Sequence, residues 1–209
     1  MSLSERTVDL LDQLRAGDQQ ALGELFTLHR ERLWRMVYVR LDRRVASRIA
    51  PDDVLQETFL DVARRIGEHL ANPTVPFYVW LRFLTIQRMQ MLQRVHLGAQ
   101  IRDRSREVSL PQSAIPFASS ESMAGQLVSG MTSPSQAAIR HELQERLRAA
   151  LDAMDPLDRE VLALRHFEEL RNNEVAQVLG ISKEAVSKRH VRALKRLKAI
   201  LTDFSGSVP

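Results

Sequence analysis

Residues 174–186, with the sequence EVAQVLGISKEAV, have the layout of two helices joined by a tight turn. Gly180 suits the left-handed backbone conformation that commonly ends a helix. Ser182 is expected to cap the second helix, because its hydroxyl can accept a hydrogen bond from a free backbone N–H group. Ile181 and Val186 are expected to fill the joint between the helices. The pattern predicts a helix-turn-helix, whose second helix can enter the major groove of DNA.

The second helix of this motif is strongly basic. Between residues 183 and 198 the only anion is Glu184. The cations of this stretch are Lys183, Lys188, Arg189, Arg192, Lys195, Arg196 and Lys198. Val186 and Ala193 are spaced to share a buried stripe, in which we expect His190 to pack rather than to bind a ligand. The other faces would attract phosphates, and the alternative is a basic helix that is merely solvated.

The composition favours a helical protein with a polyanionic partner. The chain has 209 residues, of which 44% are hydrophobic and only 5% aromatic, and its formal net charge is +4. Gly and Pro are few, a mixture that favours helices, and a basic balance suits nucleic acid. The absence of cysteine excludes disulfides, thiolate metal sites and cysteine nucleophiles. It fits a cytoplasmic protein.

Apolar residues recur at helical spacing in two blocks, residues 1–95 and residues 134–209. The second block opens on a capping box at residues 133–136. Between residues 96 and 133 the periodicity is lost and Ser, Pro, Gly and Gln are frequent, which indicates a linker; a short helix at residues 123–128 is compatible with it. We predict an all-α fold, in which a bundle of three or four helices and a helix-turn-helix bundle are joined by a long linker.

Nothing in the sequence indicates an enzyme. The histidines are not spaced as ligands of a metal ion, and there is neither a glycine-rich phosphate loop nor a nucleophile elbow. The carboxylates are spread along helix surfaces, where ion pairs account for them. No catalytic residue, cofactor or metal site is expected. No apolar run approaches the roughly 20 residues that cross a bilayer, so no membrane span is expected either.

Three segments resemble conserved regions of the extracytoplasmic-function sigma factors, a group of bacterial RNA polymerase subunits in the sigma-70 family. PDDVLQETFL at residues 51–60 is similar to their region 2.2, and FYVWL at residues 77–81 is similar to the start of their region 2.3. Residues 157–197 are similar to their region 4. The matches follow the order of the family and cover residues 8–95 and 136–201, and their combination is specific.

This resemblance implies a function and a set of partners. Residues 1–95 would form a sigma-2 domain, which docks on core RNA polymerase and opens the −10 element of a promoter. Residues 134–209 would form a sigma-4 domain, which reads the −35 element. The chain would then direct promoter recognition and transcription initiation in the cytoplasm without being an enzyme. Its partners would be core polymerase and promoter DNA, and an anti-sigma factor is a further partner that the resemblance allows.

Correspondence with the family assigns candidate residues to both promoter elements. Those assigned to the −35 element are Lys183, Glu184, Ser187, Lys188, Arg189, Val191 and Arg192. Those assigned to the −10 element are His69, Asn72, Trp80, Gln87 and Arg88. His69 and Asn72 could hydrogen-bond a flipped base, and Arg88 could neutralise phosphates. A plain surface loop around His69 is the alternative, and Trp80 is also expected to pack in the core.

The candidates for binding core polymerase share one face of the helix that begins at Pro51. They are Asp53, Gln56, Glu57, Leu60, Asp61 and Arg64. A polar face with an exposed leucine suits a protein interface rather than DNA, and the resemblance assigns this face to the polymerase. An ordinary solvated face is the alternative.

Two other classes of protein also carry a terminal helix-turn-helix. A free-standing transcriptional regulator would bind duplex DNA alone, commonly as a dimer, and residues 51–60 argue against it. A serine recombinase would need a nucleophilic serine in an α/β domain, and the first 95 residues show no strand pattern. The chain departs from the sigma factors in its long linker and at Asn172, which we expect to cap the first helix of the motif in place of the usual serine.

Overall fold

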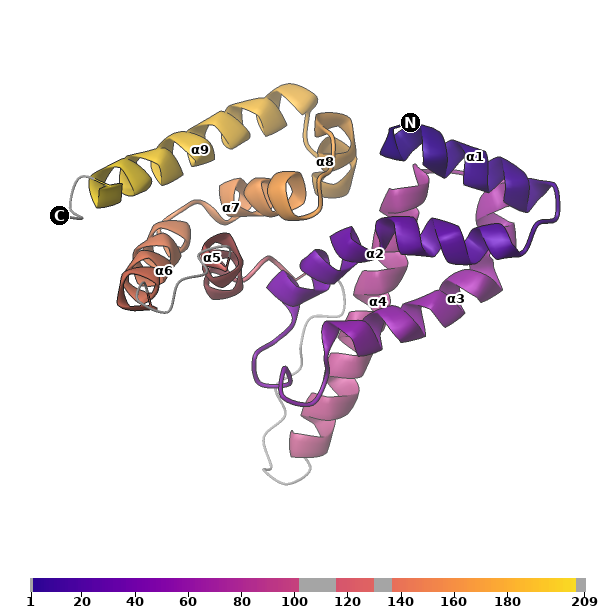
Figure 1. Ribbon diagram of the computed structural model, residues 1–209, viewed down its shortest axis with the longest axis horizontal. Coiled ribbons are helices and arrows are strands. Elements are labelled where there is room, and N and C mark those ends of the chain that lie inside the picture. Colours follow the sequence, from indigo (N-terminus) through magenta and orange to yellow (C-terminus); the bar gives the residue numbers. More distant parts are fainter. Residues whose placement is uncertain (1, 102–115, 130–136, 206–209) are drawn as a thin grey trace. The chain divides into compact units, whose positions relative to one another are not determined.

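The computed structural model describes residues 2–101, 116–129 and 137–205, which are helical with short connections and contain no strand (Figure 1). The chain divides into two compact units, Met1–Ile115 and Pro116–Pro209. The prediction of an all-α fold with two helical domains is therefore confirmed. None of the described helices is both long enough and apolar enough to cross a membrane.

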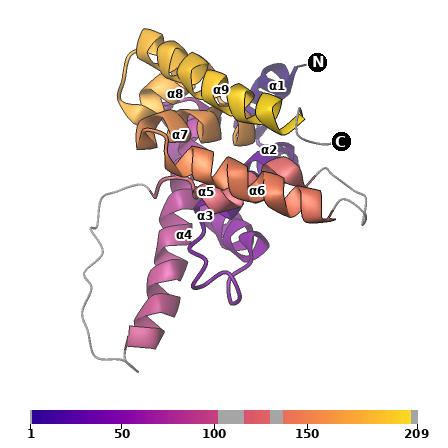
Figure 2. The same cartoon turned by 90° about the vertical axis from the view of Figure 1, so that its left-hand side faces the viewer.

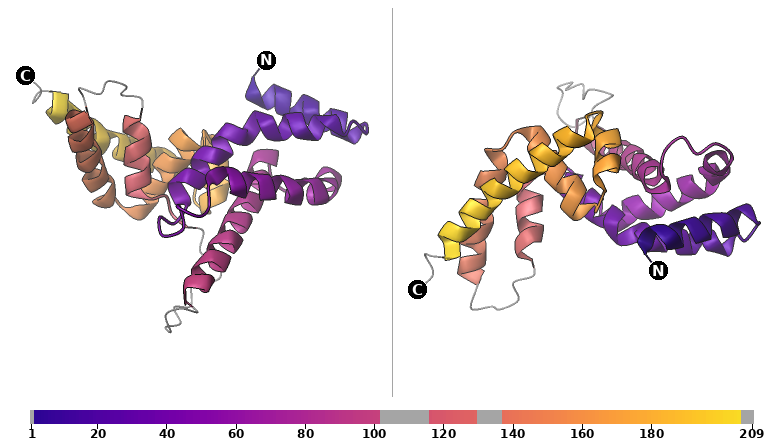
Figure 3. Two further views of the ribbon diagram at one scale, coloured as in Figure 1. Left: turned by 60° about the horizontal axis from the view of Figure 1, so that its bottom comes forward. Right: turned by 90° about the horizontal axis from the view of Figure 1, so that it is seen from above.

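Unit 1, Met1–Ile115, is a bundle of long helices. In its described part these are α1 (Leu3–Arg15), α2 (Gln20–Arg40), α3 (Pro51–Ala71) and α4 (Phe77–Ile101). α1 lies along α2, as Figure 3 shows, and α2, α3 and α4 pack pairwise on one another.

Local sequence signals place the first residues of these helices. Ser2 accepts a hydrogen bond from the N–H group of Glu5 at 3.3 Å, and the Glu5 carboxylate accepts one from the N–H group of Ser2 at 2.7 Å. Pro51 is the first residue of α3, where its missing N–H group would have no partner within the helix. The Asp53 carboxylate accepts from the N–H group of Ala50 at 2.8 Å. Asp53 therefore stabilises the start of α3, besides being a candidate contact of the polymerase.

The core of unit 1 lies between α2, α3 and α4. Its large, fully buried side chains are Leu25, Leu33, Met36, Leu55, Leu81, Leu84 and Met89. Phe26 of α2 meets Phe59 of α3 edge to face, with 5.2 Å between the ring centroids. Burying one such side chain contributes roughly 1.5–3 kcal/mol. The packing of these three helices therefore fixes the positions of α3 and α4, on which most of the candidate residues of unit 1 lie.

A buried histidine ties α1 to α2. His29 is 2% exposed, and its Nε2 atom lies 3.0 Å from the Thr7 hydroxyl. Because that hydroxyl donates to the Leu3 carbonyl at 2.8 Å, Nε2 carries the hydrogen and donates to Thr7. The unprotonated Nδ1 then faces Arg32 Nη1 at 3.5 Å. Burial, and after it the charge of Arg32, lowers the pKa of His29 from 6.5 to about 4.

Unit 1 is expected to lose stability as the pH falls from 6.5 to 4. The unfolded chain takes up a proton at His29 near pH 6.5, whereas the folded chain resists it until about pH 4. The free energy of unfolding should therefore fall by roughly 2–3 kcal/mol over this interval. Urea unfolding followed by circular dichroism at each pH measures the change. His29→Gln cannot titrate and should respond less to pH, and an identical response in both proteins would contradict the prediction.

Unit 2, Pro116–Pro209, ends with the basic helix of the sequence motif. Its described helices are α5 (Ser120–Val128), α6 (Ala137–Asp152), α7 (Pro156–Leu162), the π-helical turn η2 (Ala163–Phe167), α8 (Asn172–Leu179) and α9 (Lys183–Ser205). α6, α7 and α8 all pack on α9, and α5 lies beside α6 (Figure 2). Leu151, Leu162 and Leu164 are fully buried among these helices.

Helices occupy part of the predicted linker, residues 96–133, and the short helix that the sequence allows at residues 123–128 forms. α4 continues beyond residue 95 to Ile101, and α5 belongs to unit 2 rather than to a connection. The capping box that the sequence predicts at residues 133–136 lies outside the described residues.

Packing on α6 and hydrogen bonds to α7 explain why α5 forms in a serine-rich stretch. The N–H group of Ala118 donates to the Glu160 carboxylate at 3.0 Å, and Arg159 Nη1 donates to the Ser120 hydroxyl at 3.1 Å. Met123 is 1% exposed. A helix as short as α5 is marginal in water by itself. Its formation therefore depends on packing against unit 2, which the local sequence pattern does not reveal.

Candidate functional site

α8 and α9 form the helix-turn-helix that the sequence predicts. Gly180 ends α8 in the left-handed conformation, with φ +64° and ψ +32°. Ser182 caps α9 by accepting a hydrogen bond from the N–H group of Ala185 at 3.1 Å. Val186 is fully buried in the joint, whereas Ile181 is only half-buried. The motif is confirmed, with Val186 as its main apolar contact.

The start of α8 differs from the prediction. The N-cap residue is Arg171 rather than Asn172, and the Glu174 carboxylate accepts from the N–H group of Arg171 at 2.7 Å. The Asn172 side chain instead donates from Nδ2 to the Ser187 hydroxyl at 2.9 Å. Ser187 in turn donates to the Lys183 carbonyl at 3.1 Å. Asn172 thus ties α8 to the exposed side of α9.

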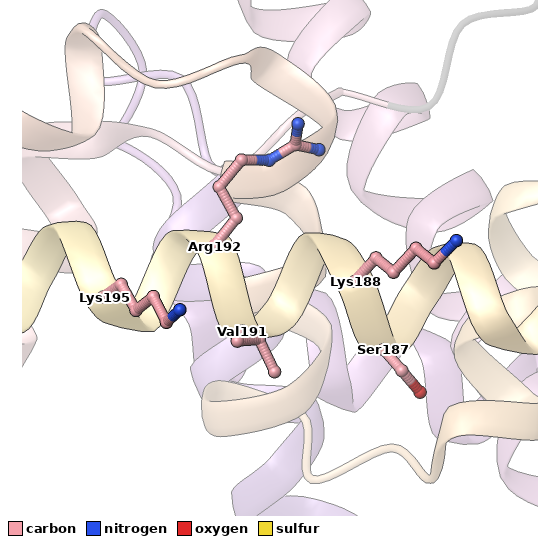
Figure 4. A pocket seen from close by; sticks show the side chains of 5 residues that line it. All are labelled: Ser187, Lys188, Val191, Arg192 and Lys195. Atoms are coloured by element: carbon pink, nitrogen blue, oxygen red, sulfur yellow. The ribbon is translucent and has the colours of Figure 1, made fainter.

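The solvent face of α9 carries a shallow depression of about 560 Å³ (Figure 4). The residues that line it are Ser187, Lys188, Val191, Arg192 and Lys195. Val191 is 52% exposed, so an apolar centre lies among cations. Such a surface can meet a thymine methyl group while its rim contacts phosphates. Lys195 was not among the candidates predicted from the sequence, although it follows Lys188 by seven residues and so lies on the same face.

Glu184 lies exposed in the first turn of α9. Hydrogen bonds from its own N–H group and from the Ser182 hydroxyl lower the pKa of Glu184, and the charges of Lys183 and Lys188 lower it further. An ionised carboxylate at the positive end of a helix stabilises that end. It also repels phosphates, so a contact of Glu184 with DNA is restricted to donors on base edges, such as the amino group of cytosine.

Arg189 and Arg192 are paired within unit 2. Asp158 of α7 accepts from Arg189 Nη1 at 2.6 Å and from Arg192 Nε at 2.7 Å. Asp155 lies 3.2 Å from Arg189. The Asp158 side chain is only 6% exposed, whereas that of Arg192 is 64% exposed. Asp158 was not predicted from the sequence, because it precedes its partners by 31 and 34 residues and carries no local signal.

His190 of α9 lies half-buried against His166 of η2. Their Nε2 atoms are 2.8 Å apart, so one ring donates a hydrogen that the other accepts. Burial lowers the pKa of both rings, and the charge of Arg165 adds to the effect. The pair is thus neutral near pH 7, and its role is packing, as the sequence predicts for His190. In the part of the chain that the structure describes, no group of three metal-ligating side chains is placed to hold an ion.

A second depression, of about 990 Å³, runs between α2 and α3 in unit 1. Its lining is Gly23, Phe26, Thr27, Arg30, Asp52, Asp53, Leu55, Gln56, Glu57, Phe59 and Leu60. Four of the six candidates for binding the polymerase are among these residues, and Leu60 is 48% exposed. The other two, Asp61 and Arg64, lie outside the lining and form an ion pair at 3.5 Å. The α2–α3 groove is thus an apolar floor with acidic and amide edges.

An ion pair joins a candidate for binding the polymerase, Asp61, to a candidate for binding the −10 element, Arg88. Arg88 of α4 donates to the two carboxylate oxygens of Asp61 on α3 at 2.6 Å and 2.7 Å. Glu57 lies 3.6 Å from Arg88, and the side chains of Arg88 and Asp61 are 16% and 21% exposed. The structure therefore corrects the expectation that Arg88 is free to neutralise phosphates, because Asp61 already balances its charge.

His69 is not open to a flipped base, contrary to the expectation from the sequence. Its ring is 6% exposed and stacks on Trp80, with 4.7 Å between centroids and 20° between planes. Burial, and after it the charge of Arg15, lowers the pKa of His69. The His69 ring therefore packs against Trp80 and holds it in place. Asn72 and Gln87 are exposed, as a contact with DNA requires.

Two exposed apolar side chains on α4 were missed by the sequence analysis. Phe83 is 52% exposed and Met91 is 49% exposed. They flank Gln87 at intervals of four residues, so the three side chains share one face of α4. An aromatic ring such as that of Phe83 can stack on an unpaired base, and Met91 would extend the apolar surface beside it. Their spacing from Gln87 was the signal in the sequence that could have identified them.

Comparisons with known proteins agree on a family. Residues 150–199 match the family model described as Sigma-70, region 4. The chain is 31% identical over 181 residues to the probable RNA polymerase sigma factor RfaY of Xanthomonas campestris pv. campestris, covering 85% of this chain and 40% of RfaY. It is 26% identical to the ECF RNA polymerase sigma factor BldN of Streptomyces coelicolor, covering 96% of this chain and 67% of BldN.

A solved structure is similar over both units. The structure of CnrH in complex with the cytosolic domain of CnrY matches with a TM-score of 0.52 and 25% identity, covering 95% of this chain and 98% of CnrH. The chain thus spans nearly all of CnrH, about two thirds of BldN and about two fifths of RfaY.

Proposed function

The chain belongs to the extracytoplasmic-function group of the sigma-70 family, and from this premise we propose that it binds core RNA polymerase and directs promoter recognition and transcription initiation. The observation that carries the proposal is the exposed face of α9, where Lys188 and Lys195 surround Val191 within the region 4 match. Such a face suits the major groove of a −35 element. The chain would act in the cytoplasm together with the polymerase, as a recognition subunit without catalysis of its own.

The roles in DNA recognition divide between the units. We assign the −35 element to the α9 residues Lys183, Glu184, Ser187, Lys188, Arg189, Val191 and Arg192, and add Lys195 from the geometry. We assign the −10 element to Asn72, Trp80 and Gln87, together with Phe83 and Met91. His69 supports Trp80 and Arg88 supports α3, so both would act on DNA only through their neighbours.

The α2–α3 groove would bind core polymerase. Leu60 supplies an exposed apolar anchor, and Asp53, Gln56 and Glu57 supply a polar rim around it. An apolar centre inside a polar rim is the usual anatomy of a protein interface. Asp61 and Arg64 would extend this contact along α3.

A protein partner would regulate this activity. The solved structure of CnrH holds the cytosolic domain of a second protein, CnrY. We propose that an anti-sigma factor of the same general kind binds this chain and withholds it from the polymerase.

The test is transcription in vitro with the full chain and purified core polymerase on a library of promoter sequences. We expect initiation at a defined set of promoters when both proteins are present, and none when either is omitted. A free-standing regulator, in contrast, would bind duplex DNA tightly without the polymerase and would not associate with it. That pattern, or the absence of any stimulated initiation, would reject the proposal.

A further inference from the structure

Asp158 stands out because a nearly buried carboxylate holds two arginines of the proposed reading helix. Its side chain is 6% exposed, and it faces Arg189 at 2.6 Å and Arg192 at 2.7 Å. It lies in the first turn of α7, where the helix dipole favours a negative charge. The carboxylate is thus desolvated and fixed before any DNA is bound.

The way in which Arg192 is held leaves part of its guanidinium available. Asp158 Oδ2 accepts from Nε at 2.7 Å, and Oδ1 accepts from Nη2 at 3.2 Å. These two donors form one edge of the planar guanidinium, and the terminal edge with Nη1 is not used by the carboxylate. The Arg192 side chain is 64% exposed and lines the depression on α9 (Figure 4). The unused edge can therefore make the bidentate contact through which arginine reads guanine.

The charges around Arg192 indicate that attraction to phosphates and discrimination between bases are carried out by different residues of α9. Asp155 and Asp158 together balance Arg189 and Arg192, so this cluster adds little net attraction to phosphates. Lys188 and Lys195 carry no ion pair in the described part of the chain and supply that attraction. An arginine with a neutralised charge and a fixed edge discriminates between bases better than it attracts DNA in general.

We propose that Asp158 is a positioning residue that fixes Arg192 for contact with one base of the promoter and thereby sets part of its sequence specificity. The inference rests on the proposed function. Asp158 itself does not touch DNA. Because Asp158 already orders the Arg192 side chain in the free protein, Arg192 loses less conformational entropy when it binds the base.

The experiment uses holoenzyme assembled from core polymerase and full-length variants, on promoters randomised across the −35 element. Asp158→Ala is compared with Asp155→Asn, which removes the exposed carboxylate that forms an ion pair with Arg189 but none with Arg192, and keeps a good helix cap. Arg192→Ala should lower discrimination at one base pair by about tenfold or more. Asp158→Ala should lower it at the same base pair by about fivefold, while Asp155→Asn should leave it unchanged.

Two further measurements separate positioning from general damage. In the Arg192→Ala background, Asp158→Ala should cause no additional loss of discrimination, because there is no side chain left to position. Arg192→Lys keeps Asp158 and the charge but has no second edge, so it should lose discrimination even if Asp158→Ala fails to fold. The binding of Asp158→Ala to non-specific DNA should not weaken, since this substitution removes a negative charge.

The outcomes are distinct. Unchanged base preference in Asp158→Ala, an equal further loss in the Arg192→Ala background, or full discrimination in Arg192→Lys would each overturn the role of Asp158. Failure of the unmodified chain to initiate at any promoter would instead remove the proposed function, and this inference with it.

Discussion

Replacing Lys188 and Lys195 by glutamate is expected to weaken promoter binding by the holoenzyme about a thousandfold at physiological salt. Both ammonium groups lie on the exposed face of α9 beside Val191, and each would lose a phosphate contact and gain a repulsion. The dependence of affinity on salt should also become shallower, by about two units in the logarithmic slope. Fluorescence anisotropy of labelled promoter DNA at several salt concentrations measures both quantities.

The control for this double charge reversal changes the net charge by the same amount at two positions outside α9. Arg6→Glu with Arg48→Glu reverses two exposed side chains of unit 1 that are not among the candidate residues, and should leave affinity within about threefold of the unmodified protein. Equal losses in the two double variants would mean that net charge, rather than the face of α9, determines binding.

Leu60→Asp is expected to weaken the association with core polymerase about a hundredfold without unfolding the chain. Leu60 lines the α2–α3 groove and is 48% exposed, so a carboxylate there remains solvated in the free protein. In a complex the same carboxylate would be desolvated without a partner, a large penalty at the centre of an interface. Competition of each variant with a labelled unmodified chain for limiting core polymerase measures the change.

Val8→Asp is the matched control for Leu60→Asp. Val8 lies on α1, outside the groove, and is 57% exposed, so the chemical change is the same and the place differs. Polymerase binding by Val8→Asp should equal that of the unmodified chain. If Leu60→Asp bound equally well, the α2–α3 groove would be excluded as the docking surface.

The features that the sequence predicted correctly are those with a local physical cause. Gly180 and Ser182 fix the turn because one backbone conformation and one hydroxyl determine it, and both are confirmed. The helical class follows from the spacing of apolar residues. The exposure of Leu60 follows from the same spacing, because it lies opposite the buried stripe of its helix, whereas Val191 was selected through the family resemblance.

The features that it did not predict depend on contacts between distant segments. Arg88 meets Asp61 across 27 residues, and Arg192 meets Asp158 across 34. His69 was expected in an open loop, but the last turn of α3 places its ring against Trp80. In each case the residue type was noticed and its partner was not, because no pattern in a single sequence specifies which side chains meet once helices pack.

The bond between Arg88 and Asp61 has a genetic consequence. α3 carries the surface proposed for the polymerase and α4 the surface proposed for the melted strand, and this bond crosses between them. Substituting Asp61 leaves the guanidinium of Arg88 with only the more distant carboxylate of Glu57, at 3.6 Å, so we expect the Arg88 side chain to move on the outer face of α4. A screen for loss of polymerase docking should therefore return alleles with altered promoter opening, and second-site suppressors of Asp61 lesions should cluster at position 88.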